Sequence, residues 1–281
     1  MKKEIINYFF MSEPKILGKI DLSQFSKERR PQFNLEKFFK FLNKELEQIA
    51  TEFNSFYGDF IEKDGTIKMI GEDEALHKKV VVAKNELYGE KKDLPQMAEL
   101  AITVFLNKII GDRFIVVRSA KYDDYEHGVD NVLVDKQTGF VVCGFDQVLG
   151  MGSNDGADKK REKVARINAK GGARLDYGIK LDAEQKIKIT KMKNIPAFFL
   201  GLSKDDLISL LDNMSQESSS GQNSDKDQDS DLSKNILNKI FKSLKEQEES
   251  IKSLLENNKD SELSSNIKNF SELLSFLESK I

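Results

Sequence analysis

The sequence predicts an α/β (α+β) fold in which a central mixed sheet of four to six strands is flanked by helices. Apolar residues recur at helical spacing in residues 34–53 and 94–110, which predicts amphipathic helices. Short apolar runs bounded by polar residues or glycine predict the strands: residues 114–118, 129–134, 140–145, 173–181 and 195–202. Because helical and strand patterns alternate along the chain, a sheet covered by helices is the architecture that buries both.

The composition limits the class of protein. The chain has 281 residues, of which 39% are hydrophobic, and this is enough to build a sizeable core. Its formal net charge of −3 indicates neither a basic nucleic-acid binder nor an acidic scaffold. A single cysteine, Cys143, cannot form an internal disulfide, and two histidines are too few for the usual Cys/His zinc sets. We expect a reducing, cytoplasmic setting, with no signal peptide and no membrane span.

Residues 1–90 are predicted to form a mostly helical region that packs on the core. A strand is expected at residues 15–22. Asn34 is a suitable N-cap for the first predicted helix, and a second helix is expected at residues 72–87.

Residues 91–213 form the predicted α/β core. Pro95 in the first turn and Gly111 at the end delimit its first helix. The strands at 129–134 and 140–145 flank a turn, residues 136–139, in which Gly139 is able to take a positive φ. Further elements follow a glycine-rich loop: a basic helix at 157–169, a small added strand at 187–192, the strands named above at 173–181 and 195–202, and a helix at 204–213.

The C-terminal part differs in composition. Residues 214–231 are rich in Ser, Asp and Gln with a single apolar residue, which predicts a flexible linker. Residues 232–281 contain two amphipathic helices whose apolar residues follow heptad spacing. They are expected either to fold as a helical hairpin on this chain or to associate with a protein partner or a second copy, and the spacing favours neither.

Acidic residues are concentrated between residues 121 and 146. Six acids stand there against two lysines: Asp123, Asp124, Glu126, Asp130, Asp135 and Asp146. A carboxylate beside a buried strand is costly to desolvate unless it is paired or bound to a metal ion. Asp123 and Asp124 are expected to lie in a simple exposed turn. The alternative is that they add an acid to the outer part of a site. His127 is able to act as an acid or base near pH 7, but a lone loop histidine usually does neither.

The order of elements in residues 94–202 resembles the PD-(D/E)XK nuclease-like superfamily, because Asp130 opens the second core strand and Asp146 lies near the end of the third. The resemblance implies a restriction-endonuclease-like core that hydrolyses the phosphodiester bonds of DNA or RNA. It also implies that Asp130 and Asp146 hold Mg²⁺ (or Mn²⁺), with Glu99 as an additional acid from the preceding helix. Carboxylate oxygens are the natural ligands of such a hard cation.

One position departs from the pattern. The superfamily places a lysine two residues after the second acid, where this chain has Val148. Lys160 and Lys163 on the following helix are the candidate substitutes, and Lys160 falls on the core-facing side of that helix. The alternative is that the lysine is lost and the protein is a non-catalytic interaction module that keeps the fold.

Strand register offers a test of the site. A three-residue hairpin loop with a bulge at Gly139 would place Asp130 opposite Asp146 on one face of the sheet, whereas a four-residue loop would pair residue 130 with residue 145 and separate the two acids. The sequence favours neither register.

Basic residues gather next to the acidic stretch. Residues 158–193 contain twelve Lys and Arg against five acids. Four of them fall on one side of the predicted basic helix and form a candidate surface for nucleic-acid phosphates: Lys159, Lys163, Arg166 and Lys170. An ordinary solvated basic face is the alternative.

Overall fold

The computed structural model describes residues 35–88, 94–149, 155–219, 226–256 and 261–281, and Leu35–Ile281 forms one compact unit. The strand expected at residues 15–22 and most of the glycine-rich loop lie outside the described residues. In the part of the chain that the structure describes, every helix is too short or too polar to span a bilayer.

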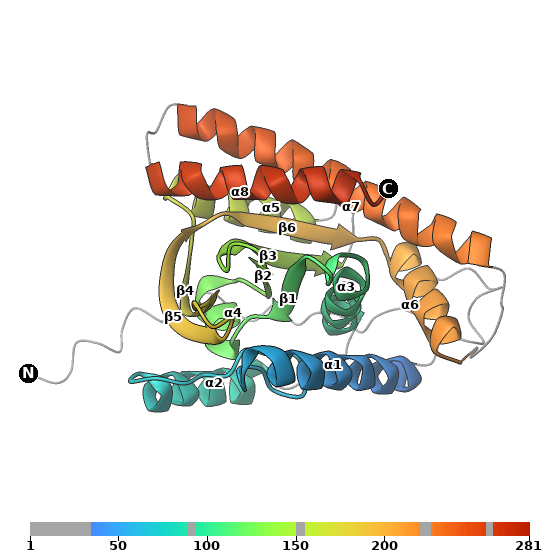
Figure 1. Cartoon of the computed structure of the whole chain (residues 1–281), viewed down its shortest axis with the longest axis horizontal. Coiled ribbons are helices and arrows are strands. Elements are labelled where there is room, and N and C mark those ends of the chain that lie inside the picture. Colours follow the sequence, from blue (N-terminus) through green and yellow to red (C-terminus); the bar gives the residue numbers. More distant parts are fainter. Residues whose placement is uncertain (1–34, 89–93, 150–154, 220–225, 257–260) are drawn as a thin grey trace, which may run out of the picture. The chain divides into compact units, whose positions relative to one another are not determined.

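The central sheet has four strands in the order β1-β2-β3-β6. These strands are β1 (Phe114–Arg118), β2 (Asn131–Asp135), β3 (Val141–Leu149) and β6 (Ala197–Leu202). β1, β2 and β3 form an antiparallel meander, and β6 lies parallel to β3. A separate antiparallel pair consists of β4 (Ala173–Leu181) and β5 (Ile187–Ile195) (Figure 1). The expected mixed sheet is therefore confirmed with four strands, while the predicted strand at 173–181 and the small added strand at 187–192 form a sheet of their own.

Helices cover the sheet. They are α1 (Leu35–Tyr57), α2 (Glu74–Tyr88), α3 (Leu94–Ile110), α4 (Lys121–His127), α5 (Asp155–Ala169), α6 (Lys204–Ser219), α7 (Lys226–Glu256) and α8 (Ser261–Glu278). Side chains alternate between the two faces of a strand, so one face of β2 and β3 presents Leu133 and Phe145 to α3, α7 and α8. The opposite face presents Val132 and Val134 to a core that α1, α5 and β4 complete.

Helix α1 shows why the N-terminal helical pattern was readable. Its buried positions recur every three or four residues: Phe38, Phe39, Leu42, Leu46, Ala50 and Phe53. These residues pack the helix against α3, and Gly58, at φ +98°, lies just beyond its last turn. The predicted helix is confirmed and continues to Tyr57.

The C-terminal helices fold back on this chain. α7 and α8 contact each other, α7 also contacts β6, and α8 contacts β3 (Figure 1). Phe270 of α8 stacks on Phe198 of β6, with ring centroids 3.7 Å apart. The apolar faces of α7 and α8 are thus buried against the chain's own sheet, and not against a partner or a second copy.

Two sequence expectations are corrected. The predicted linker at 214–231 is helical at both ends, since α6 reaches Ser219 and α7 begins at Lys226. Helix formation is cooperative, so polar residues that follow a packed helical segment tend to continue the helix. Met214 is buried and extends the packed part of α6. The acidic segment after β1 is not a loop, because residues 121–127 form helix α4, which ends at Gly128 in the left-handed conformation.

The hairpin register brings the two predicted acids to the same face. The loop has four residues, because the N–H of Asp135 donates to the carbonyl of Phe140. Leu133 pairs with Cys143, however, and Val134 pairs with Val141, which leaves Val142 as an extra residue in β3. Beyond this bulge Asn131 faces Phe145, and continuing that register places Asp130 opposite Asp146.

Candidate active site

Asp146 on β3 is the centre of a cluster of charges. It is buried, and each of its carboxylate oxygens accepts a hydrogen bond from a lysine of α5. The amine of Lys160 lies 2.5 Å from Oδ1, and the amine of Lys163 lies 2.9 Å from Oδ2. The same Lys160 amine is 3.9 Å from Oδ2 of Asp130. The structure therefore brings together four of the five residues that the sequence nominated for catalysis.

Lys160 reaches the position next to Val148. Val148 has no charged group, and its side chain packs on the hydrophobic core. Lys160 also donates to the carbonyl oxygen of Gln147, the residue between Asp146 and Val148. An amine from α5 thus lies against the stretch of β3 where the superfamily's lysine would stand.

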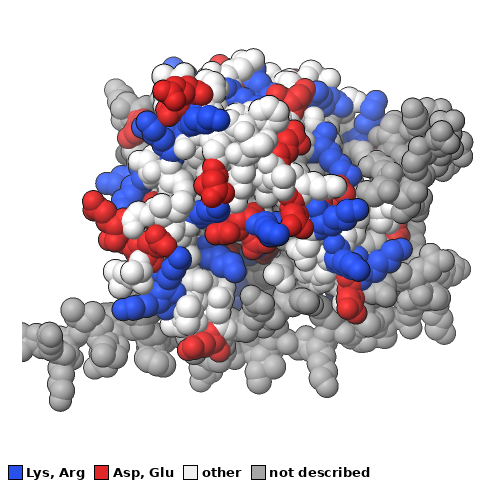
Figure 2. Space-filling view, turned by 60° about the horizontal axis from the view of Figure 1, so that its bottom comes forward, with Lys and Arg blue, Asp and Glu red and all other residues white. Residues whose placement is uncertain are grey.

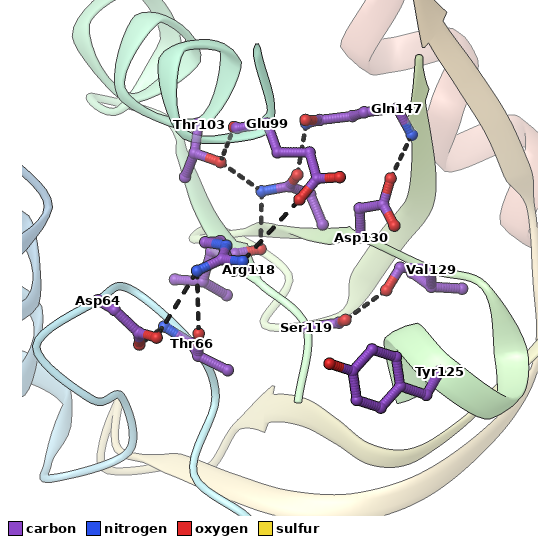
Figure 3. Close-up of polar contacts among 12 residues, drawn as sticks. Asp64, Thr66, Glu99, Thr103, Arg118, Ser119, Tyr125, Val129, Asp130 and Gln147 are labelled. Carbon is purple, nitrogen blue, oxygen red and sulfur yellow. Dashed lines mark hydrogen bonds and ion pairs between the residues drawn. The ribbon is translucent and has the colours of Figure 1, made fainter. Parts of the chain in front are cut away.

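The backbone holds Asp130 firmly. Its N–H donates to the carbonyl of Phe145 at 2.7 Å, and its own carbonyl accepts from the N–H of Ser119 at 2.9 Å. Its Oδ2 accepts from the N–H of Gln147, as Figure 3 shows. Because these bonds come from both neighbouring strands, the Asp130 carboxylate has little freedom to turn away from Asp146.

Glu99 on α3 lies at the edge of the cluster. Its carboxylate lies 3.9 Å from the guanidinium of Arg118 at the end of β1, and Arg118 also lies 3.6 Å from Asp64 (Figure 3). The charge of Glu99 still reaches Asp130, where it adds to the effect of burial in raising the pKa of that carboxyl. Glu99 is near the two central acids but is engaged with an arginine.

A buried polar network lies behind the site. The side-chain amide of Asn131 donates to the hydroxyl of Thr103 at 2.7 Å, and the amide of Gln147 donates to the carbonyl oxygen of Asn131 (Figure 3). All three side chains are buried. This network, which sequence reasoning missed, ties α3 to the two strands that carry Asp130 and Asp146.

Acidic groups are under-neutralised around Asp130. Asp124 of α4 lies close enough to this cluster for the charges of Arg118, Lys160 and Asp146 to affect its pKa. Burial, followed by the charge of Glu99, raises the pKa of Asp130 well above its ordinary value, and burial also raises that of Asp124. The alternative of Asp124 as an outer acid of the site is thus favoured by its position.

The side chains of Glu99, Asp130 and Asp146 are chemically suitable ligands for a hard divalent cation, but they do not lie close enough together to form a ligand set. Carboxylates are suitable ligands, and the raised pKa values mark a place where a cation would be stabilised. Glu99, Asp130 and Asp146 do not, however, bring one ligand atom each within 4.8 Å of the others. Both oxygens of Asp146 are already bonded to amines, so a metal ion would have to displace at least one lysine.

Among the described residues, one group does bring three such donors within 4.8 Å of each other: Asp123, His127 and Asp176. The expectation that Asp123 lies in an exposed turn is wrong, since this side chain is fully buried. His127 is not isolated either, because it lies 3.2 Å from Asp176. The signal in the sequence was the four-residue spacing of Asp123 and His127, which places both on one side of a helix.

The predicted basic surface is only partly present. Lys159, Arg166 and Lys170 are exposed on α5, but Lys163 is turned toward Asp146. On the face shown in Figure 2, basic and acidic side chains of the described residues lie interspersed rather than in separate fields of one sign.

Comparison with known proteins gave no match: no family model, no curated protein and no solved structure matches this chain.

Proposed function

We propose that this protein is a metal-dependent nuclease-like hydrolase of the phosphodiester bonds of DNA or RNA, of the PD-(D/E)XK type. The observation that carries the proposal is the position of Lys160, with its amine 2.5 Å from Asp146 and 3.9 Å from Asp130. A lysine on the following helix thereby stands in for the one that Val148 replaces.

The connectivity of the core supports the same proposal. The core contains a helix (α3), an antiparallel three-stranded meander (β1, β2 and β3) with α4 inserted after its first strand, a second helix (α5) and a strand parallel to the third (β6). This is the order of elements on which the resemblance to the superfamily rests, with β4 and β5 as an insertion before the last strand. Fold alone does not imply activity, so the side chains carry the functional argument.

Each residue has a distinct role in the proposed reaction. When bound, Mg²⁺ or Mn²⁺ polarises the phosphate and lowers the pKa of a bound water. Asp130 and Asp146 would hold the ion once at least one lysine has given up its bond to Asp146, and Asp124 and Glu99 would add negative charge around it. Burial alone would lower the pKa of Lys160, but the charges of Asp130 and Asp146 raise it above its ordinary value. Lys160 therefore stays cationic near neutral pH, where it orients the water and stabilises developing negative charge rather than accepting a proton.

The alternative, a non-catalytic interaction module, is favoured by the pairing of Asp146. Two lysines neutralise this carboxylate without a metal ion, an arrangement that stabilises the fold and needs no chemistry. In that case the exposed basic residues of α5 would contact nucleic acid or a protein partner, and removal of Asp146 would leave binding intact.

Calorimetry and a cleavage assay distinguish the nuclease from the non-catalytic interaction module. Mg²⁺ and Mn²⁺ are titrated into the wild-type protein and into a variant with Asp130→Ala and Asp146→Ala, and both are then incubated with single- and double-stranded DNA and RNA. The proposal expects metal binding and metal-dependent cleavage that the double variant loses. Lys40→Met, on an exposed position of α1, is the control and should retain both. Cleavage that survives in the double variant would contradict the assignment of the site, and binding of nucleic acid without metal uptake or cleavage would favour the interaction module.

A further inference from the structure

A second group of ionisable side chains lies on the side of α4 that faces β4. Asp123 and His127 are one helical turn apart, and Asp176 of β4 approaches both. The Nε2 atom of His127 is 3.2 Å from Oδ2 of Asp176 and 3.8 Å from Oδ1 of Asp123. Each of the three residues offers a donor atom within 4.8 Å of the other two. Donors around a tetrahedral Zn²⁺ with bonds of about 2.0–2.1 Å lie roughly 3.4 Å apart, so the spacing is close to that of a ligand set.

The carboxylates are oriented by their own partners. The two oxygens of Asp123 accept hydrogen bonds from the backbone N–H groups of Asp176 at 2.7 Å and Tyr177 at 2.9 Å. On Asp176, Oδ1 accepts from the guanidinium of Arg174 at 2.7 Å, which leaves Oδ2 directed at His127. Metal ligands are typically fixed by such outer hydrogen bonds, and here the bonds come from a rigid strand.

Charge and burial also point to a cation. The side chains of Asp123 and Asp176 are almost fully buried, while their basic neighbour Arg174 is half exposed. Burial raises the pKa of Asp123 to about 6, in spite of its two backbone hydrogen bonds. Burial alone would raise the pKa of Asp176, but its hydrogen bonds with Arg174 and His127 lower it, so the carboxylate that lacks compensating charge is mainly that of Asp123.

Two of the three donor residues approach solvent. A cavity of about 420 Å³ is lined in part by Asp73, His77, Asp176, Tyr177 and Lys191. The side chain of His127 is also 21% exposed. An ion with three protein ligands would thus keep an open position for water, and it need not cross the core to enter.

We propose that Asp123, His127 and Asp176 form a binding site for Zn²⁺, separate from the acidic cluster at Asp130 and Asp146. The imidazole nitrogen selects a first-row transition ion over Mg²⁺, because nitrogen donors suit zinc and its neighbours. The bound ion joins α4 to β4. Asp124 lies on the same short helix, so the zinc would also fix the backbone that carries this residue.

Cobalt provides a direct test, since Co²⁺ occupies zinc sites and its visible absorption reports the ligand geometry. Metal-free wild-type protein is titrated with Co²⁺, and Zn²⁺ is then added. We expect one equivalent of Co²⁺ to produce visible bands that Zn²⁺ removes. The chain has only two histidines, so the imidazole ¹⁵N resonances of His127 and His77 can be followed in a separate titration with diamagnetic Zn²⁺, and the Nε2 resonance of His127 should shift strongly while those of His77 move little.

Two variants complete the test. His127→Asn removes the nitrogen donor and should weaken Co²⁺ binding by at least 100-fold, a loss on the order of the effects seen when ligands or their partners are removed. Asp130→Asn, in the other cluster, should leave Co²⁺ binding unchanged, so the two sites can fail independently. The absence of Co²⁺ and Zn²⁺ binding in the wild type would overturn the proposal without reference to any variant, as would unchanged His127 resonances on saturation with Zn²⁺.

Discussion

Gly128 lies directly beneath the amine of Lys163. A Cβ atom at residue 128 would stand 1.9 Å from Nζ of Lys163, and the backbone there has φ +65°. The glycine that ends α4 thus leaves the space through which Lys163 reaches Asp146.

Gly128→Ala should therefore destabilise the protein through two separate effects. Alanine at positive φ costs about 1 kcal/mol, and displacement of Lys163 from Asp146 adds to this cost. Gly58→Ala is the matched control, because Gly58 also has positive φ but has open space around its Cβ position. Urea unfolding should show a larger loss for Gly128→Ala than for Gly58→Ala. When both glycine substitutions are made in a Lys163→Ala background, their costs should become equal; a difference that persists there would show that the contact with Lys163 is not its cause.

Lys160→Met tests whether Lys160 takes the role of the lysine that is absent at position 148. Methionine keeps most of the side-chain volume and removes the charge. Under the proposed function, metal-dependent cleavage should fall by about 10²–10⁴-fold, while Lys163 still pairs with Asp146 and the fold persists. Lys40→Met, at an exposed position of α1, should cleave at the wild-type rate. The readout is the single-turnover rate at saturating Mn²⁺, with circular dichroism to verify folding; equal rates for the two variants would remove Lys160 from the site.

Phe270→Ala tests how the C-terminal helices are held. The ring is fully buried and stacks on Phe198 at 3.7 Å, so its removal should cost about 3–5 kcal/mol of unfolding free energy. Leu254→Ala, at a position that is 42% exposed on α7, should cost less than about 1 kcal/mol. Chemical denaturation measures both. Similar small losses for the two would mean that α8 does not depend on the sheet for its position.

The elements that could be predicted from the sequence are those in which burial creates a periodic pattern. Helix α1 and strand β6 were recognisable because each buries an apolar set at regular spacing or in a continuous run. The acids Asp130 and Asp146 were recognisable because a carboxylate beside such a strand is unusual.

What could not be predicted depends on contacts between distant residues. The register of β2 and β3 is set by a bulge at Val142, and the four-residue loop alone would have indicated the other register. Helix α4 has no side-chain cap at its start. It is anchored by hydrogen bonds from Asp123 to the backbone of residues 176 and 177, more than 50 positions away, so the local sequence of polar residues read as a loop.

Because of Cys143, the free energy of unfolding should depend on pH in the alkaline range. Its thiol is fully buried on β3, and burial raises its pKa well above the ordinary value of 9.0. In the folded protein the thiol therefore keeps its proton at a pH where the unfolded chain has lost it. Unfolding then releases a proton, so the unfolding free energy should fall as pH rises above about 9, with a limiting slope of about 1.4 kcal/mol per pH unit from this group.

The comparison with Cys143→Ala isolates that contribution, since tyrosines and lysines titrate in the same range in both proteins. We expect the variant to be less stable at pH 7, because a buried side chain is shortened, but to lose less stability than the wild type between pH 9 and pH 10.5. Urea unfolding at four pH values provides the difference in slope. A thiol reagent gives an independent reading: because the thiolate is the reactive form, the native protein should react only as fast as it opens, and rapid modification at pH 8 without denaturant would show that Cys143 is accessible in the folded state.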